Sequence, residues 1–141
     1  MIAISEIAAA THDQERFTRL NKIFIDDLIH LAQETSFHVE GPLAVPPEIF
    51  SEPKTVIADP VMKAYVHGLC EHLCDLSHRI YPAWTSNRSS YLEMPYYFGP
   101  ANNSSRYDYL RTTPGPFRTR LLFTGPVFKK FWDIYRKTPV A

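Results

Sequence analysis

The clearest helix signal in the chain is DPVMKAYVHGLCEHLCDLSHRIYP, residues 59–82. Asp59 suits the N-cap, and Pro60 suits the first helical position because it has no N–H to leave unpaired. Pro82 is expected to end the helix. Apolar side chains between them recur at spacings of three and four residues, which predicts one buried face. That seam consists of Met62, Val66, Leu69, Leu73, Leu76 and Ile80.

Opposite this seam, the same helix carries a narrow stripe of polar and thiol side chains. At 100° per residue the stripe spans about 60° and consists of His67, Glu71, Cys74 and His78. We interpret it as a solvent-exposed face. The alternative is a transition-metal site, with His67, Cys74 and His78 as candidate ligands and His12 or His38 as a fourth. We expect neither a metal nor a cofactor, because the spacing matches no zinc-finger pattern.

A second helix is predicted over residues 12–35. Thr11 suits its N-cap, and Gln14 completes a capping box. One apolar stripe follows, made of Phe17, Leu20, Phe24, Leu28 and Leu31. Two helices with apolar stripes predict an antiparallel helical pair or, alternatively, a dimer seam. Residues 36–58 contain four prolines and are expected to form a connector with a short strand near 37–40.

Charge divides the chain into two halves. Residues 1–78 hold twelve acidic and five basic side chains, a net charge of −7, whereas residues 79–141 hold three and ten, a net of +7. The second half also has fourteen of the nineteen aromatic residues and none of the six histidines. A basic, aromatic surface suits phosphate-bearing or acidic partners. It is equally suited to contact the acidic half of the same chain.

The basic half has the alternation of a β-hairpin. Residues 105–112 and 117–124 alternate with the period of strands, and the Pro- and Gly-rich residues 113–116 form the loop. Adding residues 90–98 gives a three-stranded antiparallel meander, and residues 126–137 are predicted to be a terminal helix. We therefore expect a single α+β domain with an acidic helical half (residues 1–80) and a basic aromatic half (81–141).

With the loop at residues 113–116, the hairpin has an arginine- and tyrosine-rich face. Arg111 would lie opposite Arg118, a like-charge pair that a bound anion would stabilise. The predicted nucleic-acid or anion-binding residues are Tyr107, Tyr109, Arg111, Arg118 and Arg120. In the alternative interpretation, these arginines pair with carboxylates of residues 1–78.

The favoured function is a small intracellular binding or regulatory protein whose hairpin contacts nucleic acid or an acidic protein. One alternative is a metal-independent phosphodiesterase resembling a ribonuclease, with Glu93 as base and the arginines stabilising the phosphorane. Another is a structural homodimer that pairs acidic and basic halves. No Gly-rich phosphate loop, nucleophile elbow or His-Glu-x-x-His motif is present.

The cellular location is predicted from the cysteines and the hydropathy. Cys70 and Cys74 lie four residues apart on a predicted helix, farther than a disulfide allows, so both should be free thiols. Free thiols are typical of a reducing compartment. No apolar run is long enough to cross a membrane. We therefore expect a cytoplasmic protein that does not bind membranes.

Overall fold

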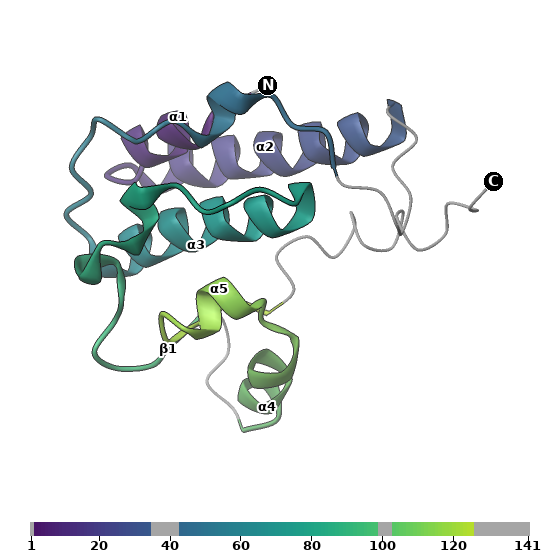
Figure 1. Cartoon of the computed structure of the whole chain (residues 1–141). Helices are drawn as coiled ribbons and strands as arrows, with labels where there is room; N and C mark the ends of the chain where they lie inside the picture. Colours follow the sequence, from purple (N-terminus) through teal and green to yellow (C-terminus); the bar gives the residue numbers. More distant parts are fainter. Residues whose placement is uncertain (1, 35–42, 99–102, 126–141) are drawn as a thin grey trace.

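The fold is mostly helical in the computed structural model, which describes residues 2–34, 43–98 and 103–125 (Figure 1). Two short strands form one sheet. The α-helices are α1 (Ile4–Ala9), α2 (Gln14–Glu34), α3 (Pro60–Ser77), α4 (Asn103–Thr112) and α5 (Gly115–Arg118). The 3₁₀ helices are η1 (Pro47–Phe50), η2 (Ala83–Ser86) and η3 (Arg88–Ser90), and the strands are β1 (Tyr96–Tyr97) and β2 (Leu122–Phe123).

Helix α3 is the centre of the fold. It contacts α1, α5, β2, η2 and η3, and in Figure 1 it runs between α2 and α5. Its predicted apolar seam is largely confirmed, because Val66, Leu69, Leu73 and Leu76 are buried. Ile80 is the exception at 96% exposure, since it lies beyond the helix end.

The predicted start of α3 is confirmed. Asp59 is the N-cap, and its Oδ1 accepts the backbone N–H groups of Val61 and Met62 at 2.8 and 3.1 Å. The helix ends before the predicted Pro82. His78 adopts a left-handed backbone with φ 54°, and this conformation stops the helix at Ser77.

Helix α2 agrees with the predicted range to within two residues, but its cap is different. Asp13 Oδ1 accepts the N–H of Arg16 at 3.2 Å, whereas the Thr11 hydroxyl donates to the carbonyl of Ala8. The predicted antiparallel arrangement is wrong. The first turns of α2 and α3 line one groove, and Phe17 and Asn21 of α2 both contact Tyr65 of α3, so the helices run in the same direction.

The predicted exposure of the polar stripe on α3 is also wrong. His67, Glu71 and Cys74 are buried, and of the stripe only His78 is exposed. The physical reason is that η2, η3 and α5 pack on the side of α3 that faces away from its seam. The helix is therefore covered on both sides, and the His67 and Glu71 side chains have polar partners inside the protein, the Thr85 carbonyl and Arg120.

The predicted antiparallel meander is wrong. Residues 103–112 form helix α4, where Arg111 contacts Asp108 at 3.8 Å and lies over the ring of Tyr107, as i,i+3 and i,i+4 neighbours do. Pro116 in the first turn of α5 suits a helix start rather than a hairpin loop. The predicted cross-strand pairing of Arg111 with Arg118 is therefore not formed.

The sheet is parallel rather than antiparallel. Tyr96 pairs with Leu122 and Tyr97 with Phe123, and only these two residues of the predicted strand 90–98 are in a strand. Leu121 has φ 61°, a left-handed turn that directs the chain from α5 into β2. The predicted strand near 37–40 and helix over 126–137 lie outside the described residues. Within those residues no helix has the length and apolarity to span a membrane.

A buried histidine on α3 should make the stability pH-dependent. His72 is 7% exposed, and burial lowers its pKa from 6.5 to about 4. Between these values the unfolded chain binds a proton that the folded chain does not. The stability that this pKa difference provides is therefore fully present above pH 6.5. As the pH falls towards 4, the free energy of unfolding decreases by about 3 kcal/mol in total.

The measurement is urea unfolding of the protein and of His72→Gln at several pH values from about 7 to about 4. The variant should lose less stability than the parent protein as the pH falls. Equal pH dependence of the two proteins would show that His72 is not responsible.

Candidate functional site

Arg120 is the most constrained side chain of the sequence-predicted binding set. It lies just after α5 and is 0% exposed. Its Nη1 donates to Glu71 Oε1 at 2.6 Å and to the carbonyl of Pro116 at 3.0 Å, and its Nη2 donates to the carbonyl of Thr85 at 2.7 Å. Its Nε donates to the Ser90 hydroxyl at 3.4 Å. The guanidinium also lies 4.5 Å from the ring centroid of Tyr91.

This network fixes the role of Arg120. All three nitrogens of the guanidinium donate to protein acceptors, so the side chain has no exposed N–H for an external ligand. It joins α3, η2, η3 and the end of α5 instead. The Arg120–Glu71 pair is an ion pair between the basic and acidic halves, which is the alternative that the sequence left open for these arginines.

Three other arginines remain exposed, around helix α4. Arg106, Leu110, Tyr107 and Arg111 fall within about 140° of the helix circumference at 100° per residue, and all are exposed. Arg118 of α5 joins them, because its Nη1 donates to the carbonyl of Leu110 at 3.4 Å. We call this set the arginine–tyrosine surface: Arg106, Tyr107, Leu110, Arg111 and Arg118.

The arginine–tyrosine surface combines charge with apolar area. Tyr107 is 65% exposed and Leu110 is 45% exposed. The guanidinium of Arg106 lies 4.9 Å from the ring centroid of Tyr97, and that of Arg111 lies 6.0 Å from that of Tyr107. Asp108 is the acidic residue of α4 and pairs with Arg111. Three arginines against one aspartate leave a net charge of +2.

The predicted binding set is thus divided by the fold. Tyr107, Arg111 and Arg118 are exposed together, whereas Arg120 is buried. Tyr109 is half-buried on the other side of α4, with its ring against Gly125. The phosphodiesterase constellation is not assembled around Arg120, because Glu71 and backbone carbonyls already occupy its guanidinium.

The candidate metal ligands are also separated. His67 Nδ1 lies 3.4 Å from the carbonyl of Thr85, and its ring packs edge-on against Trp84. Cys74 is buried with Cys70, and both are free thiols as predicted. His78 is exposed beyond the helix end. Among the residues that the structure describes, no group of three His, Cys, Asp or Glu side chains is placed to hold a metal ion.

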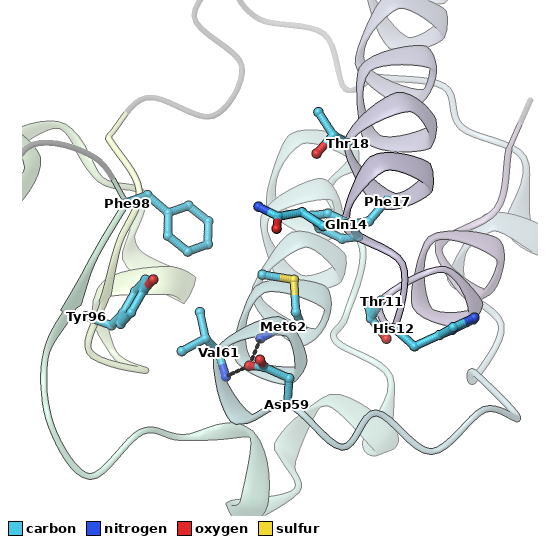
Figure 2. Close-up of a pocket in the computed structure, with 10 residues that line it drawn as sticks. All are labelled: Thr11, His12, Gln14, Phe17, Thr18, Asp59, Val61, Met62, Tyr96 and Phe98. Atoms are coloured by element: carbon cyan, nitrogen blue, oxygen red, sulfur yellow. Dashed lines mark hydrogen bonds between the residues drawn. The ribbon is translucent and has the colours of Figure 1, made fainter.

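A groove of about 630 Å³ lies where α2, α3 and β1 meet (Figure 2). Its apolar lining comes from all three elements: Phe17, Val61, Met62, Tyr96 and Phe98. The carboxylate in this lining, Asp59, already accepts two N–H groups of α3. The other polar lining residues are Thr11, His12, Gln14 and Thr18, so the groove offers both apolar and polar contacts.

A second cleft, of about 670 Å³, lies over the Arg120–Glu71 pair and is lined by Glu71, Asp75, Tyr81, Ser86, Tyr91, Gly115, Pro116 and Thr119. The Tyr81 hydroxyl donates to Asp75 Oδ1 at 2.6 Å. Burial raises the pKa of the Asp75 carboxyl, the Tyr81 hydrogen bond lowers it, and the charge of Glu71 raises it. Burial and the bond to Asp75 raise the pKa of Tyr81.

Sequence reasoning placed Glu71 in the polar stripe but missed the other residues of this cleft. Glu71 and Asp75 are four apart on a helix and therefore share one face, a signal that was available. Tyr81 and Tyr91 had no signal, because only tertiary packing brings them to α3. Leu110 was not among the predicted binding residues, and its exposure follows from its place on helix α4.

Comparisons of the chain with protein-family models, with curated proteins and with solved structures give no match.

Proposed function

We propose that the protein is a binding protein whose arginine–tyrosine surface docks an acidic segment of a partner protein. The observation that carries this proposal is the exposure of Tyr107 and Leu110 between three arginines on one side of α4 and α5. Nothing in the described residues covers this surface.

The composition of the surface supports a protein partner. Tyrosine and arginine are enriched among the residues that dominate binding energies at protein interfaces. Arginine forks bind carboxylates with two parallel hydrogen bonds, which suits aspartate and glutamate side chains of the partner. Leu110 and the Tyr107 ring provide apolar area for one or two apolar side chains within the same segment.

Nucleic acid fits the same surface less well. A formal net charge of zero gives the whole chain no long-range attraction for a polyanion, and dedicated nucleic-acid binders are usually strongly basic. An exposed leucine also has no counterpart along a phosphate backbone. Nucleic acid is therefore the alternative outcome of the test.

The test is a charge reversal, Arg111→Glu with Arg118→Glu. Binding of a fluorescent peptide with alternating glutamate and leucine residues should weaken by at least ~tenfold, because two attractive contacts become repulsive. Binding should also weaken as salt is raised from about 0.05 to 0.3 M, since the contacts are exposed. Fluorescence anisotropy measures both effects.

The matched control is Arg16→Glu with Arg19→Glu, which changes the net charge equally at exposed positions of α2. It should bind the peptide as the parent protein does. Tighter binding of single-stranded oligonucleotide than of peptide would assign the surface to nucleic acid. If neither probe binds at low salt, the proposal is wrong. The acidic partner can also be a second copy of this chain. Light scattering tests this, because a mass near twice 16.3 kDa would identify a dimer.

A further inference from the structure

The cleft over the Arg120–Glu71 pair has an unbalanced negative charge. Its lining includes two carboxylates, of Glu71 and Asp75, and no lysine, arginine or histidine. Arg120 lies behind the lining and neutralises one carboxylate, but its nitrogens are all engaged and it is 0% exposed. An anionic ligand would therefore meet carboxylates and no available cationic group.

The two tyrosines of the cleft add aromatic surface to this charge. Tyr81 is 43% exposed and Tyr91 is 39% exposed. The ring of Tyr91 already has one cation against it, the Arg120 guanidinium at 4.5 Å. Carboxylates beside exposed aromatic rings bind organic ammonium groups, through charge and through the negative face of the ring.

Asp75 is the acceptor that a cation would meet first. Asp75 is exposed, whereas the Glu71 side chain is only 8% exposed and its Oε1 accepts a hydrogen bond from Arg120. The Tyr81 hydroxyl orients the Asp75 carboxylate by its hydrogen bond of 2.6 Å. The hydroxyls of Ser86 and Thr119 line the same cleft and are further acceptors for an ammonium N–H.

We propose that this cleft binds a primary alkylammonium group, with its nitrogen at Asp75 and its methylenes against Tyr81 and Tyr91. The group belongs either to a small free amine or to a lysine side chain of another protein. The site is separate from the arginine–tyrosine surface and does not depend on the function proposed for it.

The test is a titration followed by NMR chemical shifts of the backbone amides of residues 71–91, with 1-butylamine as one ligand and N-acetyl-lysine-methylamide as the other. Saturable shifts are expected with at least one of them at concentrations up to ~10 mM, which detects even a weak site. Binding of both supports a general amine site, and binding of the lysine compound alone identifies a protein side chain as the source. Butyrate, an anion of the same length, should not bind.

Three variants separate this site from general charge attraction. Asp75→Asn keeps an acceptor for Tyr81 but removes the charge, and it should weaken amine binding at least ~tenfold. Asp108→Asn removes an exposed carboxylate on α4 and should leave binding unchanged. Tyr81→Phe keeps the ring but removes the hydroxyl that orients Asp75, and it should weaken binding less than Asp75→Asn does. The proposal is wrong if neither amine gives saturable shifts. It is also wrong if Asp75→Asn and Asp108→Asn weaken amine binding equally.

Discussion

Replacing Arg120 by alanine should lower the free energy of unfolding by about 3–5 kcal/mol. The substitution leaves the Glu71 carboxylate buried without its cation, and it removes the donors to the carbonyls of Thr85 and Pro116. The Glu71 carboxylate is the costly group, because it is buried without its cation. The two carbonyls each lose one donor and keep contacts with His67 Nδ1 and the Thr119 hydroxyl. Urea unfolding followed by circular dichroism measures the change.

The matched control is Arg118→Ala, two residues earlier and exposed. It should change the free energy of unfolding by no more than about 0.5 kcal/mol. The double variant Glu71→Leu with Arg120→Met should be more stable than Arg120→Ala, because no unpaired charge remains. A loss for Arg120→Ala no larger than that for Arg118→Ala would contradict the assigned role of the Arg120–Glu71 pair.

Replacing Phe117 by alanine should cost about 3–5 kcal/mol, through lost burial and the cavity left behind. The ring is 0% exposed and lies between Tyr65, at a centroid distance of 5.7 Å, and His72, at 6.0 Å. It fills the space over Gly68 of α3, so this one side chain fixes the distance between α3 and α5.

The opposite change at the same contact is Gly68→Ala. A Cβ atom on Gly68 would lie 2.6 Å from Phe117 Cδ1 and 2.9 Å from Cε1, well inside van der Waals contact. Overpacking costs about 1–3 kcal/mol, which exceeds the gain of up to about 1 kcal/mol in helix propensity. Thermal unfolding should therefore show a lower midpoint than for the parent protein.

Gly115 provides the matched control for Gly68. A Cβ atom there would meet no heavy atom within 4 Å, so Gly115→Ala should be neutral or slightly stabilising. The double variant Gly68→Ala with Phe117→Leu has a smaller side chain at position 117. It should recover part of the stability that Gly68→Ala alone loses. An unchanged midpoint in Gly68→Ala would show that Phe117 moves aside freely.

The two long helices were predictable because their signals are local. Asp59 followed by Pro60, and apolar residues at spacings of three and four, depend only on neighbours along the chain. The relative direction of α2 and α3 was not predictable, because the long segment between them can return the chain to the end where α2 begins. A short loop would have required an antiparallel pair.

Burial of the polar face of α3 depends on segments that come later in the chain, namely η2, η3 and α5. One local signal was nevertheless present. No lysine or arginine occurs between Lys63 and Arg79, whereas an exposed helix face usually carries such residues. A helix without them over four turns is typical of one that is covered on all sides.

The hairpin was predicted from alternation that a helix also satisfies. Tyr107 and Arg111 lie two residues on either side of Tyr109, but they are also i,i+4 neighbours of each other on α4. For a segment of only ten residues the two periods overlap, and Pro116 then suits a helix start as well as a loop. Tyr107, Arg111 and Arg118 are nevertheless exposed as predicted, because these polar side chains can reach solvent from a helix as well as from a strand.

The Arg120–Glu71 pair has a consequence for how the chain folds during synthesis. The two partners are separated by 49 residues, and the ribosome completes α3 well before it adds Arg120. Until then the Glu71 carboxylate and the side of α3 that α5 covers have no partner. We therefore expect the first half of the chain to reach its final packing only after the second half has emerged.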